Sequence, residues 1–530
     1  MLSILSAKSP EGRMAFFYSE PTIQKIGYCS HDVSSLRRIY EKKGAEGLTH
    51  LEGEYTLVLT QGLNCIVVTS PVGAMHYFYT VRGGRFFHGD QINTILKQSG
   101  LAWQWNWSAL GDLCQLENLT GNATLHPAIH RVPPGSILKF GDGSISLKST
   151  TYIDTIALRP PDPDEAVKAF NESVATWAGP KPYVSLSGGF DSRVILSSML
   201  KQGIKPHLIT MGTSNATDVQ VARQIATKFG LQHDLISLQL DDFFTHAPTI
   251  SAITNGTKTS WHWHTYLYPH KAAIPPEASF FVGTLGEFAR SYYFDRGKIG
   301  NLAALAPVSA LRKFWNLKLD RHPSFEADEL SDLAPDFASQ LNASGRALRA
   351  EKLTGYCHGQ FLPGLTRYYF EQRVPNFYAN GIRMYRSSSH WRSPFHSRRW
   401  IDAIWNLPSS WKLGSNWHRY AIRCNCPDLL AFPEENGFDR YRMLSKAPPL
   451  YWTPPMRRAK YVSYDLSSEW YRNSQLQDFI QANASCIDDI AEPNLVKRIL
   501  RNHVSGSDRT RSLAFLLTMI YWKHSLVDRP

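Results

Sequence analysis

Short hydrophobic runs separated by turn residues dominate roughly the first 150 residues of the chain, a pattern that predicts strands. The runs are rich in β-branched and aromatic residues, and glycine or proline stands between them. The predicted strands are Tyr55–Thr60, Cys65–Ser70 and Tyr77–Val81, with one more inside Val132–Gly143. The proline-rich segment Arg159–Asp164 then predicts a domain boundary, with one domain over residues 1–158 and a second over 159–530.

Beyond this boundary, short hydrophobic runs alternate with longer amphipathic segments. The pattern predicts strands at Tyr183–Leu186, His207–Met211 and Leu235–Leu238, and helices at Asp191–Gln202 and Asp218–Phe229. Such alternation is typical of a parallel sheet with right-handed crossovers, whose ligands bind beyond the carboxyl ends of the strands. The remainder has mainly helical and loop character. We therefore expect an α/β fold with a β-rich N-terminal domain and a helical C-terminal part.

Composition narrows the class of protein. Hydrophobic residues make up 43% and charged residues 19%, which is ordinary for a globular protein. No apolar stretch approaches the ~18 residues that a membrane span needs, and the first residues lack the features of a signal peptide. The seven cysteines are odd in number and include no Cys-x-x-Cys pair. We therefore expect a cytoplasmic protein without a membrane partner.

Positive charge is unevenly distributed along the chain. The formal net charge is 57 − 45 = +12, and residues 383–460 contain 14 basic against 5 acidic residues. A positive field there would attract ATP, pyrophosphate, an acidic substrate or nucleic acid. A solvated basic face explains the same count equally well, so charge alone does not choose a ligand.

The most informative segment is Ser185–Arg193, which follows a predicted strand and opens a predicted helix. Two adjacent glycines let the backbone turn tightly and approach an anion, and the helix N-terminus directs N–H groups at that anion. Ser187 and Ser192 add hydroxyl donors. Asp191 would repel bare phosphate, so we expect it to hold a Mg²⁺ ion that bridges phosphate oxygens. The Gly-x-x-x-x-Gly-Lys pattern of a Walker loop is absent.

The run Ser187–Ser192 reads Ser-Gly-Gly-Phe-Asp-Ser and resembles the Ser-Gly-Gly-x-Asp-Ser signature of the ATP-pyrophosphatase superfamily. The likeness continues through Thr210–Gly212, Asp218 and His233–Ile236. It implies that ATP is split between its α and β phosphates and that AMP is transferred to a carbonyl oxygen, with ATP and Mg²⁺ as cofactors. Carried over to this sequence, the nucleotide contacts are Leu186, Ser187, Gly188, Gly189, Asp191, Ser192, Met211 and Gly283, and the metal ligands are Asp191 and Glu287.

The order of the domains resembles that of asparagine synthetases. Leu51–Tyr55, Pro71–Tyr79 and Ile129–Gly135 are similar to segments of their N-terminal glutaminase domain. Those glutaminases use a cysteine directly after the initiator Met, with its free α-amino group as the base. Leu2 stands at that place here and Ser3 is a weak substitute, so we expect a degenerate glutaminase-like domain that does not hydrolyse glutamine.

The segment Phe281–Arg290 resembles the Ser-Gly-Glu-Gly-x-Asp-Glu motif of asparagine synthetases, with two departures. Glu287 aligns with the Asp of that motif, a Mg²⁺ ligand, and Thr284 aligns with the Glu that assists attack by the amine. A carboxylate thus remains for the metal while the usual base is missing. This departure puts asparagine itself in doubt as the product.

Three histidines follow one another closely at His262, His264 and His270. A His-x-His pair on a strand can bind zinc, but without a nearby carboxylate or thiol, aromatic packing is the stronger interpretation. Since related ligases place the base for the amine in this neighbourhood, His262 or His264 could fill that role.

The segment Arg392–Pro408 resembles the family's "Pro-Phe-Leu-Asp … Leu-Pro" helix. Family members then present a lysine that stabilises the charge developing on the α-phosphate. The candidate for this lysine is Lys446, with Arg440 and Arg442 as rivals. The resemblance therefore implies Lys446, Arg440 and Glu287 as catalytic residues.

Together these resemblances predict a ligase that adenylates a substrate carboxylate with ATP and then couples it to an amine. Relatives without the N-terminal cysteine use an amine already present on a substrate, and include β-lactam synthetases, carbapenam synthetases and lasso-peptide cyclases. The chain's size, its reduced N-terminal domain and its Arg- and Trp-rich C-terminal half favour macrolactam formation in a lasso-type peptide, in antibiotic biosynthesis with a partner peptidase.

Two other enzyme functions stay open. One is ammonia-dependent amidation of a small molecule or surface sugar, and the other is tRNA modification by an ATP-pyrophosphatase. The tRNA-modifying enzymes usually begin near the phosphate loop or carry Cys-x-x-Cys, and this chain does neither, so nucleic acid is not the expected partner. A non-catalytic scaffold disagrees with the intact signature at Ser187–Ser192.

Overall fold

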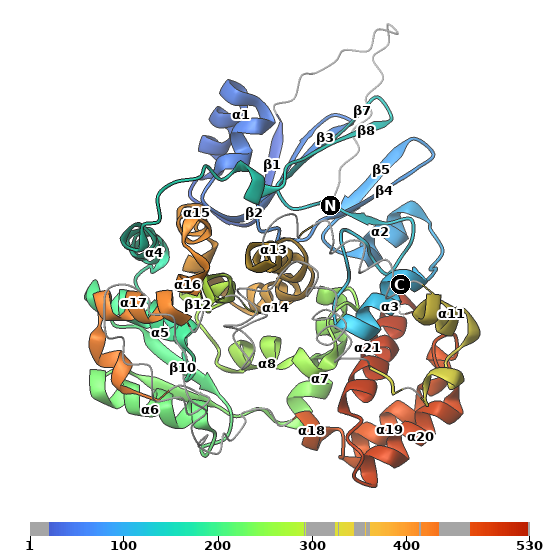
Figure 1. The fold of residues 1–530 in the computed structure, drawn as a ribbon. Helices are drawn as coiled ribbons and strands as arrows, with labels where there is room; N and C mark the ends of the chain where they lie inside the picture. The colour runs from blue at the N-terminus through green and yellow to red at the C-terminus, as the bar shows by residue number, and fades with distance from the viewer. Residues whose placement is uncertain are drawn as a thin grey trace, which may run out of the picture.

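The chain folds into a region of antiparallel strands, a parallel sheet with flanking helices, and a helical C-terminal part (Figure 1). The computed structural model describes residues 21–290, 292, 324–326, 328–343, 356, 361–412, 415–433 and 467–527. In Figure 1 the antiparallel strands lie at the top, the parallel sheet at the lower left and the last helices at the lower right. This arrangement confirms the predicted α/β fold class.

The N-terminal strands form a larger sheet in the order β1-β2-β3-β7-β8 and a smaller one in the order β5-β4-β6. Their bounds are β1 Thr22–Cys29, β2 Gly53–Gln61, β3 Asn64–Thr69, β4 Phe78–Arg82, β5 Arg85–Gly89, β6 His130–Arg131, β7 Ser136–Gly141 and β8 Ser144–Ser149. The strands predicted from Tyr55, Cys65 and Tyr77 are confirmed as β2, β3 and β4, and β7 is the strand predicted inside residues 132–143. Gly83 and Gly84 close the β4–β5 hairpin with φ of 57° and 70°, which glycine adopts without strain.

The helices of this region are α1 Val33–Gly47, α2 Ile92–Ser99 and α3 Trp107–Leu116. Asp32 caps α1, because its Oδ1 accepts from the Ser35 amide at 2.8 Å. Asn106 caps α3 in the same way, with its Oδ1 3.3 Å from the Ala109 amide.

The parallel sheet has the order β11-β10-β9-β12-β13, and all its described pairs are parallel. The bounds are β9 Tyr183–Ser185, β10 His207–Met211, β11 His233–Ile236, β12 Ser279–Phe281 and β13 His390–Arg392. Three of the strands were predicted, although β11 begins two residues earlier than expected. The sequence did not predict β12 and β13, which are three residues long and pair across a wide gap in sequence, with Phe280 opposite Trp391.

Helices flank the parallel sheet and also lie between it and the antiparallel strands (Figure 1). Those near the parallel sheet are α4 Pro163–Trp177, α5 Phe190–Lys201, α6 Thr217–Phe229, α15 Arg398–Asn406, α16 Ser409–Lys412 and α17 Asn416–Asn425. The central ones are α7 Leu240–Thr254, α8 His264–Lys271, α13 Phe361–Tyr368, the π-helix η7 Tyr369–Tyr378 and α14 Ala379–Ser388. The last group is α11 Pro335–Ala343, α18 Ser467–Trp470, α19 Ser474–Ala482, α20 Pro493–Val504 and α21 Thr510–Val527. Within the described ranges, no helix combines the length and apolarity needed to cross a membrane.

Two large hydrophobic cores hold these elements together. One runs from the antiparallel strands into the C-terminal helices and includes Val67, Trp105 and Trp522. The other lies beneath the first turn of α5 and includes Phe170 and Trp417. Because the first core is shared between the N-terminal region and the rest of the chain, the boundary at residues 158/159 stays a prediction.

A buried contact between a carboxylate and an imidazole links the antiparallel sheet to the loop after β13. The Glu54 Oε2 lies 3.0 Å from the His396 Nδ1, and both side chains are excluded from solvent. The other carboxylate oxygen of Glu54 accepts from the Ala74 amide at 2.8 Å and from the Ser70 hydroxyl. A buried carboxylate with three donors is stable only while each donor stays in place.

We therefore expect His396→Ala to destabilise the full chain by about 1–3 kcal/mol, because it leaves a buried carboxylate oxygen of Glu54 without its hydrogen-bond partner. Thermal unfolding followed by circular dichroism measures the change. Lys148→Gln, which removes the exposed pair of Lys148 with Glu46, is the control and should leave the unfolding temperature nearly unchanged. Equal unfolding temperatures for the two variants would contradict a structural role for the Glu54–His396 pair.

Candidate nucleotide and metal site

The loop between β9 and α5 lies at the carboxyl edge of the parallel sheet, where the sequence placed the phosphate site. The Gly188 amide donates to the Asp218 Oδ1 at 2.6 Å, and the Gly189 amide donates to the Ser187 Oγ at 3.1 Å. The Ser192 hydroxyl accepts from the Ser187 amide at 3.2 Å. Among the described residues no side chain caps α5, so the first N–H groups of this helix are available to an anion.

Two further predicted nucleotide contacts lie at the ends of neighbouring strands. Met211 ends β10, and Leu186 follows β9 and is buried. The Leu186 amide donates to the Ile209 carbonyl at 3.0 Å, and the Thr210 hydroxyl donates to the Leu186 carbonyl at 2.7 Å. These bonds fix the loop to β10, so the structure brings Leu186 and Met211 to the same edge of the sheet as the phosphate loop.

The carboxylate of Asp191 is held by two cationic or polar partners. Its Oδ2 lies 2.9 Å from an Arg290 guanidinium nitrogen, and its Oδ1 lies 2.8 Å from the His418 Nε2. Burial alone would raise the pKa of Asp191, but the charge of Arg290 and the bond to His418 outweigh burial and hold the pKa below its usual value. Asp191 is therefore ionised at neutral pH.

Glu287 is the second carboxylate of the site. Its Oε1 lies 3.5 Å from the same Arg290 nitrogen that contacts Asp191. The hydroxyls of Tyr369 and Tyr378 donate to Glu287 at 3.2 Å each. Burial and then the charge of Asp191 raise the pKa of Glu287, and Arg290 opposes that rise. The structure thus brings the two predicted metal ligands to one shared cation.

The segment between β12 and η4 Gly286–Arg290 packs its backbone directly on Asp191. A Cβ atom at Gly283 would lie 2.7 Å from the Asp191 Cβ, and one at Gly286 would lie 2.4 Å from the Asp191 Oδ1. Between them Leu285 has a φ of 74°, an unusual conformation for a buried branched residue. Only glycine at these two positions leaves room for the carboxylate, which gives the predicted contact Gly283 a steric role.

The π-helix η7 separates this site from a second buried cluster. Tyr369 and Tyr378 face Glu287, whereas Phe377 packs against Lys258 and Arg373. The Lys258 Nζ lies 3.0 Å from the centroid of the Phe377 ring, and the Arg373 Cζ lies 3.8 Å from it. π-Helical segments are rare and frequent at functional sites, and η7, ten residues long, contributes to two groups of buried titratable side chains.

His262, one of the two predicted bases, belongs to the second cluster. Its Nε2 lies 3.8 Å from Glu117, whose other carboxylate oxygen lies 3.4 Å from Arg511. Burial lowers the pKa of His262 to about 4, so the ring is neutral at pH 7. Burial would raise the pKa of Glu117, but the hydrogen bond with His262 and the charges of its neighbours hold it well below the usual range. Because His262 is neutral, Arg511 and Arg373 are the cations that act on Glu117 at neutral pH.

The zinc hypothesis for the histidines finds no support in the described part of the chain, where no group of three His, Cys, Asp or Glu side chains could hold a metal ion. The His270 ring stacks on Tyr266 with centroids 5.4 Å apart, and the rings of His262 and His264 lie 6.2 Å apart. Aromatic packing therefore accounts for His270.

Several predicted residues lie outside the described residues. Lys446, Arg440 and Arg442 fall within residues 434–466, and Leu2 and Ser3 fall within residues 1–20. Their roles stay predictions.

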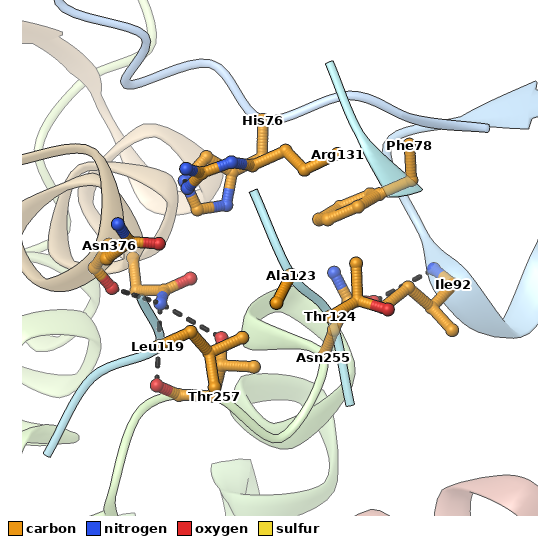
Figure 2. A pocket seen from close by; sticks show the side chains of 11 residues that line it. His76, Phe78, Ile92, Leu119, Ala123, Thr124, Arg131, Asn255, Thr257 and Asn376 are labelled. Atoms are coloured by element: carbon orange, nitrogen blue, oxygen red, sulfur yellow. Dashed lines mark hydrogen bonds between the residues drawn. The ribbon is translucent and has the colours of Figure 1, made fainter. Parts of the chain in front are cut away.

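A pocket between the N-terminal region and the rest of the chain is a separate feature (Figure 2). Its lining includes His76, Arg131, Asn255, Asn376 and Asn380. The Arg131 guanidinium donates to the Pro375 carbonyl, and Asn380 donates to the Thr257 hydroxyl at 2.9 Å. No acidic side chain is among the described residues that line it, so it does not resemble a metal site. Its hydrogen bonds tie η7 to the antiparallel strands.

Comparison with known families finds a match for two segments of the chain. Residues 28–153 match the family described as a glutamine amidotransferase domain, and residues 168–273 match asparagine synthase. These matches support an asparagine synthetase-family protein. No curated protein matches the chain.

The asparagine synthase match covers the phosphate loop, β10, β11 and the second cluster's Lys258 and His262. A domain of this kind implies a ligase that forms C–N bonds, and the family uses ATP, generally with Mg²⁺. The asparagine synthase match does not reach Glu287, Arg290 or His418, so the evidence for those residues is their geometry around Asp191.

Sequence reasoning missed five residues that the structure places at the site: Arg193, Arg290, Tyr369, Tyr378 and His418. Arg290 alone had a local signal, since a basic residue three positions after Glu287 on a helical turn forms an ion pair. The fully buried Arg193 donates to the Gly188 carbonyl at 2.6 Å and to the Phe432 carbonyl at 2.8 Å. It ties the phosphate loop to the chain that precedes residue 434.

The low pKa of His262 makes a prediction about acid stability. A neutral buried imidazole stabilises the fold above its usual pKa of 6.5, and this stability is lost as the pH falls toward 4. The free energy of unfolding of the wild type should fall when the pH is lowered from 7 to 4.5. In His262→Gln this fall should be about 2 kcal/mol smaller, since one pKa unit corresponds to about 1.4 kcal/mol. Urea unfolding at both pH values measures the difference.

The matched control is His130→Gln, which changes an exposed histidine and should keep the wild-type loss of stability. If His262→Gln loses as much stability on acidification as the wild type, then His262 is not the buried neutral group described here.

Proposed function

We propose that the chain is an ATP-consuming, AMP-forming amide-bond synthetase that adenylates a carboxylate and couples it to an amine of a peptide, closing a lasso-type macrolactam. The observation that carries the proposal is the ionised carboxylate of Asp191 inside the phosphate loop, with Glu287 beside it. The asparagine synthase match over residues 168–273 supports the same reaction class.

The chain's own residues provide binding and orientation in this reaction. The N-terminus of α5 and the hydroxyls of Ser187 and Ser192 are positioned to hold the phosphates that leave as pyrophosphate. Asp191 stays ionised because Arg290 and His418 stabilise its charge. A carboxylate needs adenylation because it is a poor electrophile, and AMP is a good leaving group.

Asp191 and Glu287 fit a Mg²⁺ ion, because both are oxygen ligands beside the phosphate loop and they already share one cation, Arg290. When bound, this ion would neutralise the negative charge of the leaving pyrophosphate. Tyr369 and Tyr378 hold the carboxylate of Glu287 in place. Burial, and then the charge of Glu287, keeps the pKa of both tyrosines well above the usual value, so both remain donors.

The base that receives the proton of the amine is His262 or His264 in this proposal. His262 is neutral, which is the form that accepts a proton, although a pKa of about 4 makes it a weak base. The half-buried His264, whose Nδ1 lies 3.2 Å from the Trp261 carbonyl, is the second candidate.

Peptide cyclisation can be tested directly. The full chain, ATP and Mg²⁺ are incubated with a peptide that carries a free N-terminal amine and an acidic side chain. The proposal expects AMP and a product lighter than the peptide by one water molecule. Amidation by added ammonium, without cyclisation, would favour the ammonia-dependent alternative, and release of ADP in place of AMP would contradict both.

Asp191→Ala should abolish ATP–pyrophosphate exchange, because it removes the carboxylate expected to hold the metal ion at the phosphates. Since this change also leaves Arg290 and His418 without their buried partner, Asp191→Asn is measured beside it to preserve shape. Asp234→Asn, at an exposed carboxylate, is the control. Near-normal exchange in a folded Asp191 variant would rule out this assignment.

Lys446→Ala should lower kcat on the order of 10²–10³ while weakening ATP binding much less, because charge on the α-phosphate develops only as its bond breaks. Arg440→Ala and Arg442→Ala are the parallel variants. If one arginine variant is inactive and Lys446→Ala is not, the role belongs to that arginine. Three active variants would show that the alignment of this segment is wrong.

A further inference from the structure

Arg290 has a position that the proposed reaction does not explain. It is the last residue of η4, and one guanidinium nitrogen lies 2.9 Å from Asp191 and 3.5 Å from Glu287. Its side chain is only 19% exposed, so these contacts form in a largely dry environment. A positive charge therefore already stands between the two carboxylates that would bind a metal ion.

The surroundings explain why a cation is needed there. Two ionised carboxylates side by side and away from water repel each other, and each loses hydration. The other oxygen of Asp191 is bonded to His418, and both oxygens of Glu287 accept from tyrosines. Among the described residues, Arg290 is the arginine that contacts both carboxylates.

Arg290 competes with a divalent ion because its guanidinium charge already lies 2.9 Å from Asp191 and 3.5 Å from Glu287. A Mg²⁺ ion bound by both carboxylates would lie close to this like charge and would be repelled by it. A metal ion that binds both carboxylates has to displace Arg290, and the largely buried guanidinium then loses its anionic partners. This loss weakens metal binding unless Arg290 finds another anion. The phosphates of a nucleotide at the N-terminus of α5 would offer Arg290 another anionic partner.

We propose that Arg290 is a built-in counter-cation that competes with the divalent metal ion for Asp191 and Glu287, so that metal binds well at this site only together with the nucleotide. The part about the nucleotide rests on the proposed function, whereas the competition between Arg290 and the metal does not. The consequence is an order of binding: the chain without nucleotide binds metal weakly, and its two carboxylates keep Arg290 as their shared counter-cation.

The test measures Mn²⁺ binding to the full chain without nucleotide or substrate, by electron paramagnetic resonance of free Mn²⁺. Arg290→Gln should bind one Mn²⁺ at least about 10-fold more tightly than the wild type, equal to about 1.4 kcal/mol. Arg290→Met removes the charge while keeping an apolar stem and should show the same gain. Arg290→Lys keeps the charge and should stay close to the wild type. Circular dichroism confirms folding of each variant.

Two controls locate the effect. Adding Asp191→Asn to Arg290→Gln should remove the gain, because the proposed ligand is lost. Arg367→Gln removes another arginine that bridges two carboxylates, those of Asp154 and Glu371, and should not create a comparable site. The proposal is overturned if the folded Arg290→Gln and Arg290→Met variants bind Mn²⁺ no more tightly than the wild type, or if the gain survives Asp191→Asn. Failure of the amide-bond assays would leave this result unaffected, since neither nucleotide nor substrate is present.

Discussion

The negative charge of Asp191 has to be stabilised inside the protein, and the structure around the phosphate loop is built to do so. Arg290 and His418 each bind one carboxylate oxygen, and they come from segments far from the loop in sequence. Gly283 and Gly286 let the backbone after β12 approach the same carboxylate. Without these contacts burial would favour the protonated form of Asp191. The loop would then lack the negative charge that is expected to bind a metal ion.

The need to stabilise buried negative charge also connects the site to the rest of the fold. The charge of Asp191 makes ionisation of the neighbouring Glu287 unfavourable, and two tyrosines of η7 donate hydrogen bonds to the Glu287 carboxylate. Within η7, the Phe377 ring contacts Arg373 of the same helix and Lys258 from outside it, and the Pro375 carbonyl accepts from Arg131 of the N-terminal region. A region that resembles a glutaminase thus braces the helix that positions a carboxylate of the synthetase site.

The sequence predicted those elements whose structure depends mainly on residues close together along the chain. The strands β2, β3, β4, β9 and β10, the helices α5 and α6, and the phosphate loop all follow from local hydrophobic period and from glycine placement. β12 and β13 could not be predicted, because three residues carry no period and their pairing spans more than a hundred residues of chain. His418 escaped prediction for the same reason: nothing near it in sequence reveals that its ring reaches Asp191.

The central claim is that Asp191 and Glu287 form a cation site at the phosphate loop, held by Arg290 until nucleotide and metal arrive together. A crystal structure of the full chain with α,β-methylene-ATP and Mn²⁺, with anomalous scattering data at the manganese edge, tests it most directly. The account predicts a manganese peak bonded to Asp191 and to phosphate oxygens at the N-terminus of α5, with the Arg290 guanidinium moved off both carboxylates. Bound nucleotide with Arg290 still on Asp191 and no manganese peak beside that carboxylate would contradict it.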